Sequence, residues 1–137
     1  MARFMWLTWL AGSAVLVWAL AQTGWTPALV MVTVGLLLVT YWLSPWYGGI
    51  SRKERDVRAL PSDQRKLIIY WRPADIFSTR LRGGLGKHGK RFMWINIWQD
   101  REAEERAKAL GDGVYPVVLV DDEVYVNPDP RKVISLL

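Results

Sequence analysis

The sequence predicts an α/β domain preceded by two membrane-spanning helices, and three patterns lead to this prediction. Apolar residues dominate the first third of the 137-residue chain, where Arg3 is the only charged residue before Arg52. After residue 66, short apolar runs alternate with amphipathic segments. Near the C-terminus, only Asp121 and Asp122 separate two apolar runs. The alternation is typical of α/β domains, and the closely spaced pair predicts a β-hairpin.

The apolar part consists of two stretches, residues 4–21 and 28–47, separated by a short uncharged turn. Each stretch has about the length of a membrane-spanning helix, roughly 17–25 residues. Basic residues are concentrated just after the second stretch, in residues 51–58, and are absent from the turn. The positive-inside rule therefore predicts a helical hairpin over residues 1–47 in the inner (plasma) membrane, with the C-terminal part in the cytoplasm. Alternatively, Ala-Leu-Ala at residues 19–21 could end a cleaved secretory signal.

Residues 48–66 are predicted to form a basic juxtamembrane linker. They begin with two glycines, are rich in charged residues and contain Pro61. The basic side chains could contact anionic lipid headgroups. Because acidic residues are interleaved with them, a solvated linker is the simpler expectation.

The first part of the C-terminal domain is predicted to be a strand, a turn and a helix. The apolar run at residues 67–71 is bounded by charged residues, which indicates a buried strand. Asp75 is a favourable N-cap for the helix that follows. The apolar stripe expected for that helix consists of Ile76, Phe77, Leu81 and Leu85. Glycines between residues 83 and 89 are expected to end it.

The remaining elements follow in order. Residues 92–97 form an apolar run that predicts a second strand. Residues 100–110 carry acidic side chains early and basic ones late, the polarity that a helix dipole favours. The runs at 117–120 and 123–126 predict a hairpin with a two-residue turn. Residues 131–137 predict a short final helix.

Composition limits the chemistry. The chain has no cysteine, so by itself it cannot carry out thiol–disulfide exchange. Its one histidine, His88, lies in a polar run that is typical of a loop. We therefore expect no catalytic residue, no metal site and no cofactor. The net charge of +5 comes from basic residues interleaved with acidic ones, which does not predict a nucleic-acid partner.

The strand–turn–helix segment at residues 70–81 resembles the active-site turn of glutaredoxins. Asp75 and Ser78 stand at the positions of that family's two cysteines, with Phe77 between them. Residues 94–98, 114–118 and 127–130 extend the resemblance to the actinobacterial mycoredoxins and their glutaredoxin-like relatives. For residues 67–137 the resemblance implies a thioredoxin-like fold of the glutaredoxin type, with the order β-α-β-α-β-β-α.

The resemblance also implies site residues. Pro116 would be cis and would face the turn, and the residue before it, Tyr115, would face outward. The degenerate active-site positions would be Asp75 and Ser78, where Asp75 acts either as a helix cap or as a recognition carboxylate. A groove for a partner would be lined by Trp71, Arg72, Phe77, Tyr115 and Pro116.

These observations predict a pseudoenzyme: a membrane-anchored, cysteine-less, glutaredoxin-like module that binds a protein partner. Two alternatives remain open. The first is a mycoredoxin-related protein of redox homeostasis that acts with a thiol of its partner. The second is an accessory subunit whose hairpin packs into a larger membrane complex, which small residues such as Gly12, Ser13 and Gly35 would permit.

Overall fold

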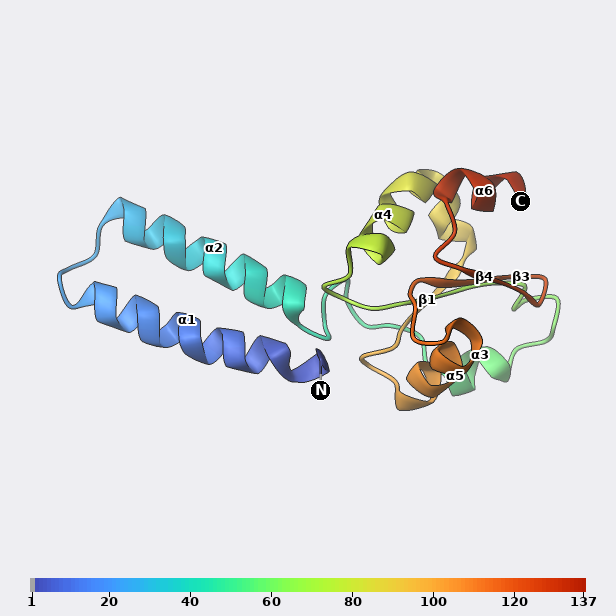
Figure 1. Cartoon of the computed structure of the whole chain (residues 1–137), viewed down its shortest axis with the longest axis horizontal. Coiled ribbons are helices and arrows are strands. Elements are labelled where there is room, and N and C mark those ends of the chain that lie inside the picture. Colours follow the sequence, from blue (N-terminus) through green and yellow to red (C-terminus); the bar gives the residue numbers. More distant parts are fainter. Residues whose placement is uncertain (1) are drawn as a thin grey trace. The chain divides into compact units, whose positions relative to one another are not determined.

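The computed structural model describes residues 2–137 and divides into two compact units. The first unit ends at Tyr47, and the second consists of Gly48–Leu137. Figure 1 shows a helical pair in the first unit and a sheet with helices in the second. Each unit is described by itself below.

The first unit is a helical hairpin. A short 3₁₀ turn, η1 (Ala2–Phe4), leads into α1 (Met5–Ala21), and α2 (Pro27–Leu43) follows. The Thr26 side chain caps α2 by accepting a hydrogen bond from the Leu29 backbone N–H at 3.2 Å. The rings of Trp6 and Trp46 meet edge to face, with their centroids 5.3 Å apart.

One helical stretch of this hairpin is long and apolar enough to cross a membrane. It covers Ala2–Ala21, has 20 residues and has a mean hydropathy of 1.7. The second helix, Pro27–Leu43, is also apolar but has 17 residues. Apolar side chains are exposed along both helices.

The second unit is built on a mixed four-stranded sheet. The strands are β1 (Leu67–Trp71), β2 (Met93–Asn96), β3 (Val117–Val120) and β4 (Glu123–Val126), in the spatial order β2-β1-β3-β4. β1 is parallel to β2 and antiparallel to β3, and β3 and β4 are antiparallel. The α/β prediction is thereby confirmed.

The predicted two-residue turn between β3 and β4 is confirmed. Asp121 and Asp122 both have positive φ, 50° and 69°. A hairpin turn of type I′ requires positive φ at both central residues, and aspartate tolerates it better than most side chains.

Helices cover both faces of the sheet. Figure 1 shows α4 (Ile76–Leu85) and α6 (Pro130–Ser135) on one side, with α3 (Glu54–Arg58) and α5 (Arg101–Gly111) on the other. A 3₁₀ helix, η2 (Gly86–Arg91), continues from α4. The core under α3 and α5 includes Val57, Tyr70, Ile95, Ala103, Ala107 and Val117.

The predicted apolar stripe of α4 is half wrong. Leu81 and Leu85 are buried, but Ile76 and Phe77 are 73% and 48% exposed. In the first turn of α4 the buried side chain is that of Ser78, which is 1% exposed. Positions 78, 81 and 85 lie on one helix face, whereas positions 76 and 77 point away from it.

The linker predicted over residues 48–66 is not a free segment. Residues 51–58 bind the edge of the domain: the Ser51 backbone N–H donates to Gln99 Oε1 at 2.9 Å, and the Glu54 backbone N–H donates to an Asp100 carboxylate oxygen at 2.6 Å. Val57 is 1% exposed in the core. The prediction of a solvated linker is therefore wrong for this part.

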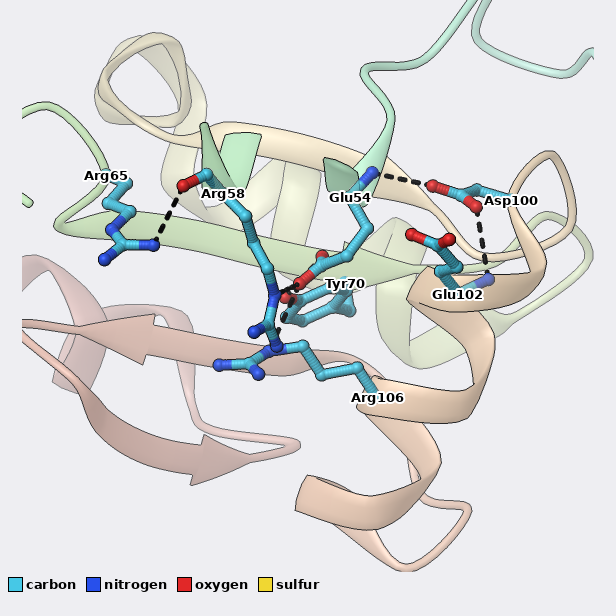
Figure 2. A network of polar contacts seen from close by, with 7 residues as sticks. All are labelled: Glu54, Arg58, Arg65, Tyr70, Asp100, Glu102 and Arg106. Atoms are coloured by element: carbon cyan, nitrogen blue, oxygen red, sulfur yellow. Dashed lines mark hydrogen bonds and ion pairs between the residues drawn. The ribbon is translucent and has the colours of Figure 1, made fainter. Parts of the chain in front are cut away.

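The side chain of Glu54 fixes α3 to the sheet, as Figure 2 shows. It accepts a hydrogen bond from the Tyr70 hydroxyl at 2.7 Å and another from Arg58 Nε at 2.7 Å. Arg106 Nε of α5 lies 3.3 Å from the same carboxylate. Burial, followed by the hydrogen bond to Glu54, raises the pKa of Tyr70 far above its ordinary value. Tyr70 is therefore a neutral donor to a carboxylate that also faces two arginines.

Candidate functional site

The candidate site is the turn between β1 and α4, formed by Arg72, Pro73, Ala74 and Asp75. Pro73 is buried, and Ala74 has a φ of 55°, in the left-handed region that non-glycine residues rarely adopt. The turn then reaches an extended residue, Asp75, which begins α4. Residues whose backbone is constrained to this left-handed region are often found at functional sites.

Asp75 caps the helix, as the sequence predicts. One oxygen, Oδ2, accepts a hydrogen bond from the Ser78 backbone N–H at 2.9 Å and another from the Ser78 hydroxyl at 2.6 Å. Asp75 is 7% exposed and Ser78 is 1% exposed. The buried carboxylate places a negative charge at the helix N-terminus, where amide N–H groups and the helix dipole favour an anion.

Arg72 links the turn to the segment that precedes β3. Its Nη2 atom lies 3.9 Å from Asp75 Oδ1. Its guanidinium carbon lies 5.0 Å from the centre of the Tyr115 ring, within cation–π distance. The turn and Pro116 were predicted to be adjacent, and Arg72 makes that connection.

The peptide bond between Tyr115 and Pro116 is cis, as predicted. The prediction that Tyr115 faces outward is wrong, because this residue is only 7% exposed and belongs to the core cluster. Burial raises the pKa of the Tyr115 hydroxyl, and the nearby charge of Arg72 opposes that rise. The ring supports Arg72 from within instead of lining an open groove.

The groove residues predicted from sequence therefore separate into two groups. Trp71, Tyr115 and Pro116 are buried, whereas Phe77 is exposed and the Arg72 side chain is 38% exposed. Ile76 is also exposed and was not predicted as a site residue. We call Arg72, Ile76 and Phe77 the turn face.

Sequence reasoning also missed the environment of Trp71. The guanidinium carbon of Arg82 lies 4.3 Å from the centre of the Trp71 ring system and 4.7 Å from that of Trp94. These three residues come from β1, α4 and β2, so no local sequence pattern indicates that they meet.

The turn does not offer the chemistry of a nucleophilic site. The Ser78 hydroxyl is buried and already donates to Asp75, and a serine nucleophile needs a base within reach. Within residues 2–137, no cluster of three or more histidine, aspartate or glutamate side chains could hold a metal ion. The arrangement is suited to recognition, with a half-exposed arginine beside exposed apolar side chains.

Comparisons with known proteins give no further identification. The chain matches no family model, no curated protein and no solved structure.

Proposed function

We propose that this protein is a membrane-anchored, cysteine-less module of the glutaredoxin type within the thioredoxin-like fold. Its turn face binds a protein partner, and the module does not exchange disulfides.

The arrangement of the second unit supports the fold part of this proposal. After β1, the order is helix, parallel strand, helix, hairpin and short helix, and β1 is central in the sheet. The turn at Asp75 and the cis Tyr115–Pro116 bond lie at the same end of β1 and β3, since Tyr70 pairs with Val117. Both features are those that the resemblance to glutaredoxins implies.

The observation that carries the functional part is the state of the α4 N-terminus. In the resembled family a thiolate occupies this position. Here the Asp75 carboxylate fills it, and that carboxylate is already bonded to two donors of Ser78. The site is thus a stable anion without a leaving group or a nucleophile, which favours recognition over exchange.

The turn face supplies the contacts expected of a small recognition surface. Ile76 and Phe77 offer exposed apolar area, and Arg72 is held by Asp75 and Tyr115 with part of its side chain in solvent. Arginine and aromatic residues are enriched among interface hot spots. A side chain held in place loses less entropy on binding than a free one.

Membrane attachment is the second part of the proposal. Both apolar helices would span the bilayer, because 17 residues lie within the range of roughly 17–25 that spanning helices need. The basic residues that follow α2 would then place the domain in the cytoplasm. A reporter active only outside the cytoplasm, fused after Leu137, should give no signal, and a strong signal would refute this orientation.

Partner binding can be tested with the full chain, solubilised from its native membranes in a mild detergent. The double substitution Ile76→Ala and Phe77→Ala should weaken the binding of proteins that co-purify with the wild type. Truncation of a hot spot costs about 2 kcal/mol or more, which is roughly a thirtyfold loss of affinity. Quantitative mass spectrometry of the eluate measures that loss.

A control variant removes exposed apolar side chains elsewhere on the domain. Val124 and Leu136 are 39% and 38% exposed. The variant Val124→Ala with Leu136→Ala should keep the partner. Equal recovery from the turn-face variant and the control would refute the turn face as the binding surface.

A second candidate function is that of an accessory subunit held by its hairpin. A hollow of about 370 Å³ lies between α1 and α2, and small residues such as Ser13, Ala14 and Ala21 contribute to its lining. Small residues permit close approach of another helix in a membrane. If this candidate is correct, Ala14→Leu should release the partner while the turn-face variant retains it.

A further inference from the structure

The sheet of the second unit has an open edge at β4. This strand is the last in the order β2-β1-β3-β4, so within the described residues only β3 pairs with it. The opposite edge is partly covered, because the Asn96 backbone N–H of β2 donates to Ser51 Oγ at 2.8 Å. An open strand edge carries unpaired N–H and C=O groups, to which another strand can add.

The register of the hairpin identifies the backbone groups that face outward. Glu123 follows the two-residue turn and therefore exchanges hydrogen bonds with β3. At the other end of β4, the Asn127 N–H donates to the Pro116 carbonyl at 2.8 Å. Residues of an antiparallel pair alternate between bonded and non-bonded positions, so Val124 and Val126 direct their N–H and C=O groups away from β3.

The side chains of β4 also suit a further strand. Val124 and Val126 are 39% and 42% exposed, and they share one face of the sheet because side chains alternate along a strand. On the other face, the Tyr125 hydroxyl donates to Glu123 Oε2 at 2.7 Å. Glu123 is the one charged residue of β4, and the strand contains no proline or glycine, so it has few of the features that protect an edge from pairing.

We propose that β4 pairs antiparallel with β4 of a second copy of this chain, about a two-fold axis at Tyr125. In this register, Val124 of each copy lies opposite Val126 of the other, and the two residues exchange both of their backbone hydrogen bonds. Every outward donor and acceptor of these valines then has a partner. The register is its own complement, which a two-fold interface requires and which a strand of unrelated sequence would not provide.

The side chains are compatible with this register. Pairs of valines meet on one face, where β-branched side chains stabilise neighbouring strands, and the two Tyr125 rings meet on the other. Glu123 of each copy lies opposite Asn127 of the other, so no like charges face each other across the pair.

A short strand buries little area, so membrane attachment matters for this pairing. β4 has 4 residues, whereas a stable interface in solution buries about 800 Å² per partner. The chain carries a helix that is long and apolar enough to enter a bilayer, and copies tethered to one bilayer meet at a high effective concentration. This inference rests on the membrane attachment in the proposed function, but it does not depend on partner binding by the turn face.

The test uses the full chain in proteoliposomes and crosslinks single cysteines. Because the chain has no cysteine, each variant carries one thiol. In Tyr125→Cys the two thiols lie directly opposite, with Cβ atoms about 4.5–5.5 Å apart, so mild oxidation should join them. In Glu123→Cys the two thiols lie about 13 Å apart and should stay free. Gel electrophoresis without reductant measures the crosslinked fraction.

Blocking variants in the Tyr125→Cys background test the edge itself. Val124→Pro removes an outward N–H and leaves the bonds to β3 intact. It should lower the ratio of dimer to monomer about 25-fold, since one hydrogen bond is lost per copy and each contributes about fivefold. Val124→Lys should act in the same direction, so a folding defect of the proline variant would not obscure the result. Val114→Lys is the control, because this valine is 47% exposed but lies outside β4, and it should change nothing.

Several outcomes would overturn the proposal. One is equal crosslinking of Tyr125→Cys and Glu123→Cys, and another is that both Val124 variants behave like the control. If the copies do not crosslink while Val124→Lys releases a co-purifying protein, the edge holds a strand of that protein and not a second copy. If the chain fails to insert into liposomes, the proposed membrane attachment fails together with this inference. If only the turn-face experiment fails, the pairing through β4 still stands.

Discussion

Removal of the Glu54 carboxylate should destabilise the whole C-terminal domain, although the residue lies in a segment that reads as a linker. In Glu54→Ala, the Tyr70 hydroxyl loses its 2.7 Å acceptor inside the core. A hydrogen bond to a buried charged group contributes about 1.5–3 kcal/mol. Arg58 and Arg106 lose an ion-pair partner as well. Their side chains are 50% and 37% exposed, so each loss costs about 0.5 kcal/mol. The expected total is about 3 kcal/mol.

A double-mutant cycle separates the terms. Tyr70→Phe removes the hydroxyl and leaves Glu54 with both arginines, so it should cost about 1.5 kcal/mol. Because the double variant loses the same hydrogen bond only once, its cost should fall short of the sum by about 1.5 kcal/mol. Glu54→Gln retains an acceptor for Tyr70 and should cost less than Glu54→Ala.

The assay is hydrogen exchange of β1 amides in the full chain in detergent, followed by mass spectrometry over a series of urea concentrations. Under conditions of fast reclosing, the exchange rate reports the free energy of opening. Glu105→Ala is the control, since this carboxylate is 69% exposed and pairs with an exposed Arg101. If Glu54→Ala costs no more than Glu105→Ala, or if the costs in the cycle are additive, the assigned role of the Glu54–Tyr70 bond is wrong.

Three further predictions use neighbouring or matched positions. Gly83→Ala should stabilise α4 by about 0.5–1 kcal/mol, because its new Cβ is free of contacts. Gly84→Ala should destabilise the domain by about 1–3 kcal/mol, because its Cβ would lie 2.5 Å from Pro130, the first residue of α6. The midpoints of thermal unfolding of the two variants should therefore shift in opposite directions. Asp75→Ala should lower the free energy of unfolding by about 1–2 kcal/mol through loss of the cap. Asp75→Asn retains an acceptor for the Ser78 N–H and should lower it by less in the same hydrogen-exchange assay. Equal losses would contradict the capping role. The pKa of Tyr70 is raised in the folded state, so above pH 10 the folded form holds more protons than the unfolded form. The free energy of unfolding should therefore fall by about 1.4 kcal/mol per pH unit above pH 10, and it should fall less steeply in Tyr70→Phe. Identical alkaline slopes for the two proteins would refute this linkage.

Local signals predicted the elements of the domain well. Apolar runs bounded by charge located β1 and β2, and the paired aspartates at 121 and 122 located the β3–β4 turn, since few other residues accept positive φ at two successive positions. Asp75 was recognisable as a cap because the bond that it makes joins residues three positions apart. Such features depend on neighbours along the chain, so the sequence contains the information that they need.

Burial and charge pairing between distant residues could not be predicted from neighbouring residues in the sequence. Tyr115 and Phe77 are both aromatic residues beside the turn, yet the first is 7% exposed and the second 48%. The segment that leads into β3 places Tyr115 in the core, whereas Phe77 lies on a face of α4 that points away from it. Glu54 appears in a solvated basic stretch of sequence, and only the return of α3 onto Tyr70 and Arg106 makes it a buried carboxylate. Arg82, Trp71 and Trp94 likewise meet only once the sheet has formed. Local sequence determined which segments became helices and strands, whereas the packing of distant segments determined which side chains became core, surface or site, because burial depends on what covers a residue and not on its type.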